Sequence, residues 1–503
     1  METVAASNEV IPDTESERTK IENYLKLYCL QDCLDEAINE VVEKRPSNPY
    51  LHISRFMDTK TLPEIMDLRL VCCFVGRGLV GVQAILTTNL SEFSGSCPIS
   101  VYGAPTEGDM ILDFAVIEAK AKEAVRGLDP TKMTEIDEVI MQVSNITPPC
   151  AMAISIACCR AGARHSGKPL HRFLSDVIES TPKMPAPVVS VVARAVGNSI
   201  NIAQTISVIP TTPSFFDGAM EAVLHASQSV NRKLDELKTP STISDFGCPC
   251  ALGTTTLEDL VKMTLEALSE DGIEGVPRIC IDLRSVDLMT PVVEGEIPYE
   301  DQSAPTYQLD GAEGNVQTGS ELVDTFMPWW RETGFISVED PLTNVDPCIE
   351  EIAEKMGSIV SDIKSEMAPE LKYNIDTGVG GHADCRLQIV ADRIFKSISD
   401  LENIREPFNA VKVGLMKGGG SVCAALKLCK AAKEASLSVI IGCAEGGPES
   451  TDTFLADFAV AVGASQFHGG GLGSCEYACK YARLVEIARD DEDLMYVGKK
   501  FRG

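Results

Sequence analysis

Short stretches of alternating apolar and polar residues recur along residues 183–503, which is typical of β-strands. In the stretch 335–342 (FISVEDPL), Ile336 and Val338 alternate with polar neighbours until a proline ends the pattern. This stretch predicts a short buried strand whose last residues are acidic, with Glu339 at its carboxyl end.

Similar strand candidates follow one another through this part of the chain, and most are separated by segments with helical periodicity. The candidates are 187–192, 206–210, 278–283, 335–339, 387–390, 410–414, 438–442 and 466–467. Helical patterns at 257–268 and 422–435 lie between some of them. The alternation predicts a closed α/β barrel of the (β/α)8 type over 183–503. The long polar segments 291–318 and 364–386 are expected to be surface insertions.

Three of the predicted strands end on or beside a carboxylate, namely Asp282, Glu339 and Asp392. Because the carboxyl ends of parallel barrel strands meet at one edge, these side chains are expected to converge there. Carboxylate oxygens are the ligands that a hard cation such as Mg²⁺ prefers. An acid after a strand is more often a helix cap or turn residue, and gathered acids can instead form buried ion pairs.

The first 180 residues have other patterns and divide into three segments. Residues 1–18 are polar and are expected to be disordered. Residues 19–60 predict two amphipathic helices, with the sequence RPSNP (45–49) breaking the chain between them. Residues 65–180 start with two strand-like runs around a Gly-rich turn and continue with helical stretches, which predicts a small α+β domain.

The segment 19–60 has an apolar stripe at helical spacing that includes Leu25, Leu34, Ile38 and Val41. Two helices of this length cannot bury such a stripe by themselves, so the segment is expected to dimerise or to dock on a partner. The alternative is an ordinary helical hairpin that packs against its own chain.

The charge balance excludes some classes of function. A formal net charge of −30, with a pI near 4.6, argues against binding to nucleic acid or to anionic membranes. No apolar run reaches transmembrane length, and the first residues, METVAASNEV, lack the apolar segment of a signal peptide. The 18 cysteines are therefore expected to be reduced thiols in a cytoplasmic setting.

The stretch 19–60 resembles the DPY-30/RIIα docking-and-dimerisation family. The matching residues are Tyr24, Leu25, Leu34, Ala37, Arg45, Pro46, Asn48 and Pro49. Modules of that family form an X-shaped four-helix dimer whose groove takes an amphipathic helix from an anchoring protein. The resemblance implies a homodimer or heterodimer, and a partner helix from an axonemal, radial-spoke or anchoring protein.

Residues 65–503 resemble the enolase family. The run TDTFLADFAVAVGASQFHGGGLGSCEYACKYARLVEIARD and the tail MYVGKKFRG parallel the end of the family, and SVEDP, QIVAD and VKVGL match its inner strands. Across 65–180 the match is weaker but colinear. The resemblance implies an enolase-like α+β cap followed by a (β/α)8-type barrel, with the small helical hairpin placed before both.

The resemblance also implies roles for particular residues. Enolases remove a proton next to a carboxylate, with a Lys or His base and with Mg²⁺ holding the enediolate. Asp282, Glu339 and Asp392 correspond to the metal ligands, and Lys412 corresponds to the base, whose pKa needs lowering toward neutrality. His468 stands in place of a substrate-binding lysine and would be catalytic only in an active enzyme.

Other family positions have changed. The general-acid loop of the family has a glutamate, but 245–253 (DFGCPCALG) has none, and a second glutamate position falls on Thr205. The family's histidine is missing near Val196, and the phosphate-gripping loop is replaced by 444–449 (AEGGPE). Losing the general acid alone costs about 10²–10⁴-fold in rate.

Two functions are consistent with these resemblances. The first is a catalytically impaired enolase-fold pseudoenzyme that serves as a structural or docking component of a ciliary or flagellar axoneme, similar to a sperm-flagellar branch of the family. The second is an active Mg²⁺-dependent phosphopyruvate hydratase, a lyase that converts 2-phosphoglycerate to phosphoenolpyruvate, tethered for local glycolytic ATP supply. An assay for phosphoenolpyruvate separates the two hypotheses.

Overall fold

A computed structural model describes the chain over most of its length. The described residues are 17–58, 60, 62–76, 79–99, 114–196, 199–211, 213–252, 256–270, 278–289, 305–308, 316–333, 335–343, 346–352, 354–355, 387–395, 397–404, 406–443 and 449–501. The chain divides into two units, Met1–Pro63 and Glu64–Gly503, which we call the head and the body.

The head is helical. Its described elements are α1 (Glu17–Leu27), α2 (Leu30–Lys44) and α3 (Pro49–Asp58). The prediction of one helix before the RPSNP break is wrong, because Cys29 adopts a left-handed backbone (φ 50°) that an α-helix cannot continue. After the break, Asn48 caps α3 by accepting the backbone N–H of Leu51 at 3.1 Å.

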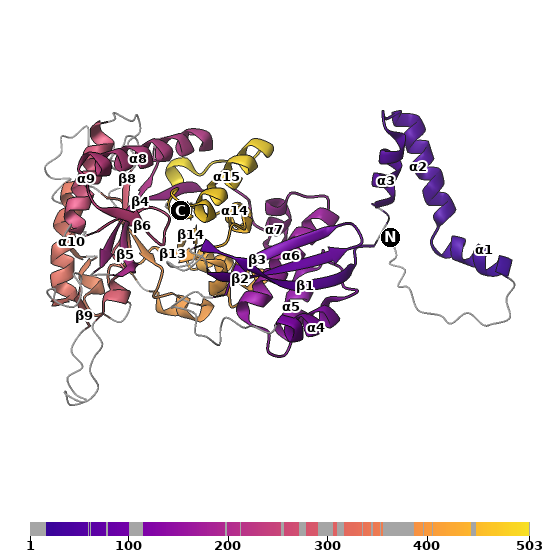
Figure 1. The fold of residues 1–503 in the computed structure, drawn as a ribbon, viewed down its shortest axis with the longest axis horizontal. Coiled ribbons are helices and arrows are strands. Elements are labelled where there is room, and N and C mark those ends of the chain that lie inside the picture. Colours follow the sequence, from indigo (N-terminus) through magenta and orange to yellow (C-terminus); the bar gives the residue numbers. More distant parts are fainter. Residues whose placement is uncertain are drawn as a thin grey trace. The chain divides into compact units, whose positions relative to one another are not determined.

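The described part of the body begins with a cap of three strands and four helices, in the α+β order that the sequence predicts (Figure 1). Its elements are β1 (Ile65–Phe74), β2 (Val80–Thr88), β3 (Glu92–Pro98), α4 (Phe114–Val125), α5 (Met133–Met141), α6 (Pro148–His165) and α7 (Leu170–Ile178). The strands form an antiparallel sheet in the order β1-β2-β3, and α6 packs on β2 and β3. Gly95 permits this close approach, because a Cβ there would lie 2.4 Å from the Ala153 carbonyl oxygen.

Eight described strands then close a barrel. They are β4 (Ala186–Val196), β5 (Ser199–Ile209), β8 (Arg278–Asp282), β11 (Ser337–Glu339), β12 (Gln388–Ala391), β13 (Ala410–Val413), β14 (Ser438–Gly442) and β15 (Gln466–His468). The strands pair in the order β15-β14-β13-β12-β11-β8-β5-β4, and β15 pairs with β4 to close the ring. All the strands predicted for the barrel are therefore confirmed.

The second strand departs from a regular (β/α)8 barrel. β5 runs antiparallel to both β4 and β8, whereas the other neighbouring pairs in the ring are parallel. The reason is the connection. β4 ends at Val196 and β5 begins at Ser199, and such a short link allows a hairpin but not the crossover that a parallel pair needs.

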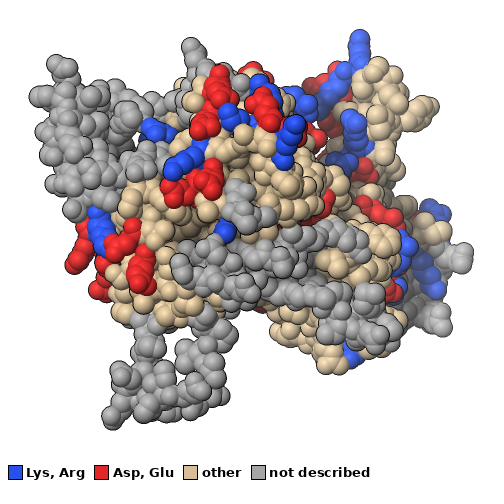
Figure 2. Space-filling model, turned by 60° about the vertical axis from the view of Figure 1, so that its left-hand side comes forward, with Lys and Arg blue, Asp and Glu red and all other residues tan. Residues whose placement is uncertain are grey.

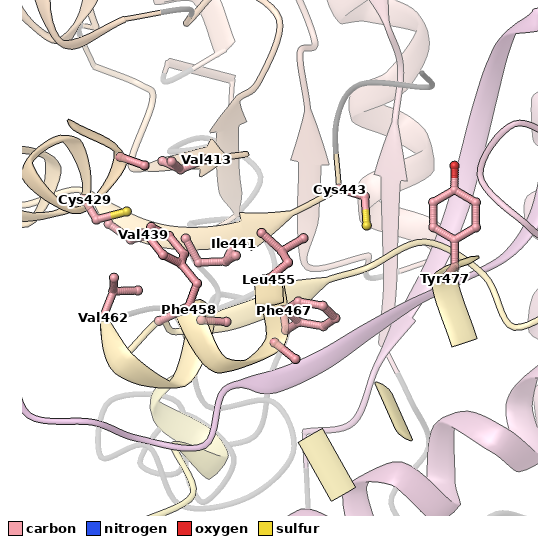
Figure 3. Close-up of a cluster of buried hydrophobic side chains, with 14 of the residues drawn as sticks. Val413, Cys429, Val439, Ile441, Cys443, Leu455, Phe458, Val462, Phe467 and Tyr477 are labelled. Atoms are coloured by element: carbon pink, nitrogen blue, oxygen red, sulfur yellow. The ribbon is translucent and has the colours of Figure 1, made fainter. Parts of the chain in front are cut away.

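Helices surround the barrel, and their apolar faces form its outer core. They are α8 (Phe216–Glu236), α9 (Leu257–Glu270), α10 (Gly319–Thr333), α13 (Val422–Glu434), α14 (Phe454–Ala461) and α15 (Cys475–Asp490). Figure 3 shows one part of this core, where Val439 and Ile441 of β14 lie beside Leu455 and Phe458 of α14 and Phe467 of β15. The alternation that predicts the strands therefore also decides which side chains meet these helices.

Shorter elements complete the described body. They are the strands β6 (Ser241–Ile243), β7 (Pro249–Ala251), β9 (Thr306–Gln308) and β10 (Val316–Thr318), and the 3₁₀ helices η2 (Ser285–Leu288), η3 (Ile398–Asn403), η4 (Leu415–Gly418) and η5 (Gly498–Lys500). β6 and β7 extend the barrel sheet beyond β4.

The predicted insertion 291–318 is described only in part, and 364–386 lies outside the described residues. β9 and β10 of the first insertion form a separate antiparallel ribbon. This ribbon is anchored rather than purely superficial, because Tyr307 is fully buried and donates a 2.6 Å hydrogen bond to Asp346.

The cap and the barrel are joined through Asp452, which lies between β14 and α14. Its carboxylate accepts two hydrogen bonds from Arg160 of α6, at 2.6 and 2.8 Å. It also accepts the backbone N–H of Ser96 in β3, at 3.0 Å. A bidentate guanidinium–carboxylate pair fixes orientation as well as distance, so this contact sets how the cap lies on the barrel.

On the face that Figure 2 shows, the basic and acidic side chains of the described residues are interspersed and form no patch of a single charge. We also find no helix in the described part of the chain that has the length and the apolar character needed to cross a membrane.

Candidate active site at the barrel mouth

The three predicted carboxylates meet at the carboxyl ends of neighbouring parallel strands. Asp282 at the end of β8 lies directly opposite Glu339 at the end of β11. Asp392 follows β12, which pairs with β11 on its other side. All three residues are at least 94% buried. The predicted convergence is therefore confirmed, and we call this end of the barrel the mouth.

Lys412 of β13 reaches the same place, as predicted. Its Nζ donates to Glu339 Oε1 at 2.6 Å and to Asp392 Oδ2 at 3.0 Å. Burial lowers the pKa of Lys412, but the Asp392 and Glu339 carboxylates outweigh burial and raise this pKa above its ordinary value. A catalytic base needs the opposite shift, so the structure holds Lys412 as an ammonium group.

Two further cations lie among the carboxylates, and sequence reasoning missed both. Lys417 in η4 donates to Asp392 Oδ1 at 2.6 Å. The Arg393 Nη1 atom lies 3.3 Å from both carboxylate oxygens of Asp282 and 3.5 Å from Asp340 Oδ2. A basic residue directly after Asp392, within the mostly apolar run LQIVADRIF, is the sequence signal that could have identified Arg393.

Asp340, the residue after Glu339, supports the ion pairs at the mouth from the backbone side. It is fully buried with a left-handed backbone (φ 45°), and its carboxylate accepts the backbone N–H groups of Asp392 at 2.9 Å and Arg393 at 2.8 Å. Burial, and then the Asp392 carboxylate, raise the pKa of Asp340 to about 7. These hydrogen bonds orient the two side chains that follow β12.

The electrostatics of Asp392 are set by its neighbours. Burial raises the pKa of Asp392, but Lys412 and Lys417 overcome burial and hold this pKa well below its usual range. Burial lowers the pKa of Lys417, and Asp392 opposes that change. Asp392 is therefore an ionised carboxylate between two amines.

His468, the last residue of β15, faces the barrel interior. Its Nε2 atom lies 3.2 Å from Ser190 Oγ and 3.1 Å from Ser207 Oγ, and its Nδ1 atom lies 3.6 Å from Glu339 Oε2. The cavity beside it has a volume of about 10 Å³, which is room for roughly one water molecule. Any catalytic role of His468 stays a prediction.

Of the positions where this chain departs from the enolase pattern, Thr205 and Phe246 lie beside residues of the mouth. Thr205 of β5 is buried directly opposite Asp282, so a hydroxyl stands where the resemblance expects a carboxylate. In the loop 245–253, Phe246 stacks under the Arg284 guanidinium at 5.4 Å. Residues 444–448 lie outside the described residues, whereas Glu449 forms an ion pair with Lys480 at 3.2 Å.

The residues present do not fit a divalent cation. Within the described part of the chain, no group of three or more His, Cys, Asp and Glu side chains is arranged to hold a metal ion. The oxygens of Asp282, Glu339 and Asp392 already face Arg393, Lys412, Lys417 or His468. A buried atom without a hydrogen-bond partner at this place is Nη2 of Arg393, which is a donor, whereas a metal cation binds acceptor atoms. The metal-ligand role of the three acids stays a prediction that this geometry disfavours.

The docking residues of the head were predicted to form an apolar stripe. Leu25, Leu34 and Ile38 have exposed fractions of 42%, 47% and 52%, and Val41 is half-buried. Further exposed apolar side chains of the head are Ile21, Tyr24, Leu27, Tyr28, Val42, Tyr50 and Leu51. In the described head, Ala37 of α2 is the buried residue, and α2 packs on α3. The head therefore leaves its apolar face uncovered within its own unit.

Fold and site together define an α/β-barrel protein with an α+β cap and a mouth filled by ion pairs. Comparison with known proteins agrees with this class. Residues 377–503 match the family described as the enolase C-terminal TIM barrel domain. Cytosolic enolase 3 of Arabidopsis thaliana is 22% identical over 96% of this chain and 99% of its own length.

Microbial enolases are similarly distant. The enolase of Methanopyrus kandleri is 23% identical over 73% of this chain and 78% of that protein. The enolase of Campylobacter lari is 24% identical over 76% of this chain and 83% of that protein. The chain therefore has an enolase-like fold and is distantly similar to these enolases.

Proposed function

We propose that this chain is a catalytically impaired enolase-fold protein that acts as a structural or docking component of a ciliary or flagellar axoneme. In this proposal the body is a stable scaffold, and the head joins it to a second copy and then to the assembly. The observation that carries the proposal is the enclosure of Lys412 between Glu339 and Asp392, at 2.6 and 3.0 Å. An ammonium group held between two carboxylates has no free electron pair with which to accept a proton from a substrate, which supports impaired catalysis.

The surroundings of Lys412 support the same conclusion. The cavity that touches Glu339 and His468 holds about one water molecule, which is too little for a phosphorylated three-carbon acid. The loop 245–253 has no glutamate that could act as the general acid, and Thr205 supplies no carboxylate at the second glutamate position. Because general acid catalysis contributes about 10²–10⁴-fold, its loss alone would reduce turnover strongly.

A second copy of the chain is the proposed occupant of the apolar face of the head. Residues 17–63 contain eight acidic and seven basic residues, so the head is nearly neutral although the chain carries −30. Two acids beside the stripe are paired within the head, Glu36 with Lys60 at 2.8 Å and Glu40 with Lys44. A symmetric dimer would therefore cover apolar side chains without bringing strong like charges together.

The docking partner and the location rest on the resemblance of the head to the DPY-30/RIIα family. In this proposal the head dimer leaves a groove for an amphipathic helix of an axonemal, radial-spoke or anchoring protein. The match to the plant enolase extends over 96% of this chain. The part of this chain that is not aligned with the plant enolase is shorter than the head, Met1–Pro63. Part of the head is therefore included in the aligned region.

An active phosphopyruvate hydratase is the second candidate. One observation favours it, namely that Asp282, Glu339, Asp392 and Lys412 meet at one place in a fold shared with enolases. The deciding experiment supplies purified full-length protein with Mg²⁺ and 2-phosphoglycerate and follows phosphoenolpyruvate by absorbance. We expect no turnover. A rate within about tenfold of ordinary enzyme turnover, roughly 1–10³ s⁻¹, would establish the second candidate instead.

A further inference from the structure

The basic side chains at the mouth have a structural role that is separate from any loss of catalytic activity. Four buried carboxylates lie there, those of Asp282, Glu339, Asp340 and Asp392, and the carboxylate of the more exposed Asp287 lies beside them. Four basic side chains, those of Arg284, Arg393, Lys412 and Lys417, lie among them. Charges buried in this number destabilise a fold unless they are paired and hydrogen-bonded, so the positions of the cations decide whether the mouth is stable.

Lys417 lies within a cage of oxygen atoms. Its Nζ is 2.6 Å from Asp392 Oδ1, 2.6 Å from the Asp392 carbonyl oxygen and 3.0 Å from the Lys412 carbonyl oxygen. An ammonium group has three N–H donors, and three oxygens are within reach here. The nitrogen thus has the kind of carboxylate and carbonyl surroundings that a bound metal cation has.

The Arg393 guanidinium likewise lies among the carboxylate oxygens of neighbouring acids. Its Nη1 is 3.3 Å from both oxygens of Asp282, and its Nε is 2.9 Å from Asp287 Oδ2. The side chain is 97% buried, so solvent does not screen these charges. Asp287 also pairs with Arg284 at 2.7 Å, which extends the network to the η2 turn.

We propose that Arg393 and Lys417 replace a divalent cation at the mouth, so that the barrel is complete and stable without a metal. A divalent ion could reach Asp282 or Asp392 only by displacing one of these side chains from its oxygens. The inference does not depend on the axonemal role. A protein that binds a metal at the mouth yet turns over no substrate would contradict it and leave the proposed function standing.

The first test measures metal binding to the full-length wild-type protein. Mn²⁺ serves as the probe, because its free form has a paramagnetic resonance signal that is lost on binding. Thermal unfolding is followed in parallel with Mg²⁺, with Mn²⁺ and with a chelator. We expect no saturable loss of the Mn²⁺ signal and the same Tm in all conditions. Saturable binding that disappears in Asp392→Asn would overturn the inference.

The second test removes the two internal cations together in Arg393→Gln/Lys417→Met. This variant keeps every carboxylate, so we expect a lower Tm with chelator and a recovery of Tm when Mg²⁺ or Mn²⁺ is added. Arg172→Gln is the matched control, because it removes a guanidinium from a carboxylate pair with Asp491 away from the mouth. Its Tm should not respond to metal.

An equal response of the double variant and the control would contradict the inference. Should the double variant fail to fold, Lys417→Met alone provides the same comparison, since Asp392 keeps its contact with Lys412. The wild-type Mn²⁺ titration remains able to overturn the inference without any variant.

Discussion

The head and the barrel mouth each reverse the usual distribution of residues, in opposite directions. The head exposes large apolar side chains, with Ile21, Tyr24 and Ile38 all more than half exposed. The mouth buries charges, with Asp340, Asp392 and Arg393 at most 3% exposed. Charges are rarely buried unless they are paired, and clustered exposed apolar residues usually mark an interface.

The two regions differ in whether their own unit supplies the groups that buried charges or exposed apolar side chains need as partners. The mouth supplies its own counter-charges from β13, η4 and the residues after β12, so it is complete within one chain. The head has no such internal solution, since α2 and α3 bury Ala37 and leave the stripe exposed. The mouth is thus complete within the body, whereas the partner that we propose for the head is a second copy of the chain.

The largest expected effect comes from charging the head. Leu34→Asp/Ile38→Asp should abolish self-association of the full-length chain, because each apolar side chain contributes about 1.5–3 kcal/mol when it is covered. Losing two corresponds to a dissociation constant higher by roughly 10²–10⁴-fold. Sedimentation equilibrium measures this constant directly.

The matched control for the head is Leu224→Asp/Leu237→Asp in the body. These leucines are 42% and 56% exposed, close to the values of Leu34 and Ile38, and the control adds the same charge. It should leave self-association unchanged. A wild-type chain that is monomeric throughout, or equal effects of the two double variants, would show that the head is not an interface between copies.

The next largest effect is expected at the mouth. Lys412→Met leaves Glu339 and Asp392 buried without their shared ammonium group, and breaking such a pair costs about 3–5 kcal/mol. Urea unfolding of the full-length protein measures the loss. Lys262→Met is the control, because its exposed pair with Glu258 is worth at most about 1 kcal/mol.

This variant also separates the two functional readings. If Lys412 is a catalytic base, its replacement should abolish phosphoenolpyruvate formation while costing the fold little. If it is a structural cation, the free energy of unfolding should fall and there should be no activity to lose. A Lys412→Met protein that keeps wild-type stability contradicts the structural reading.

The sequence was sufficient for the parts of the fold that depend on local periodicity. Alternation around Ile336 and Val338, and similar runs elsewhere, predicted the strands, because a buried strand needs apolar side chains at every second residue. The same rule predicted that Asp282, Glu339 and Asp392 meet, since they end parallel strands of one barrel.

Features that depend on contacts between distant segments could not be predicted in this way. Lys417 is in a Gly-rich turn and reaches Asp392 only because β12 and β13 are neighbours in the barrel. A basic residue in a loop is usually solvated, so its sequence carries no sign of burial. The break at Cys29 was missed for a related reason, because its neighbours on both sides have helical spacing.

A smaller effect tests the internal packing of the head. Ala37→Leu adds atoms where α2 and α3 meet, and overpacking of this kind costs about 1–3 kcal/mol. Hydrogen exchange of residues 17–58 in the full-length chain should therefore be faster by about five- to 150-fold, with the body unchanged. The control Asn39→Leu is at an exposed position of α2 and should leave exchange nearly unchanged. Equal exchange in the two variants would mean that α2 and α3 do not pack around Ala37.

The smallest effect concerns a charge pair with intermediate burial, and it completes the comparison between exposed and buried regions. Arg172 of α7 donates to Asp491, just after α15, at 2.7 and 2.8 Å, and His171 Nε2 lies 2.8 Å from the same carboxylate. The hydrogen bonds from Arg172 lower the pKa of Asp491 to about 2. A lowered carboxyl pKa stabilises the fold above the ordinary value of about 3.9, and this contribution is lost as the pH falls from about 4 to about 2.

Arg172→Gln should therefore be less stable than the wild type near neutral pH, by at most about 1 kcal/mol because Arg172 is partly exposed. The difference in urea midpoint between the two proteins should shrink as the pH falls from about 4 toward about 2, because a protonated, neutral Asp491 no longer attracts the Arg172 guanidinium by its charge. Lys168→Gln, which breaks the exposed pair of Lys168 with Asp176, is the control and should change the midpoint very little. A difference between wild type and Arg172→Gln that stays constant across this pH range would mean that the pair acts through packing of the Arg172 side chain rather than through its charge.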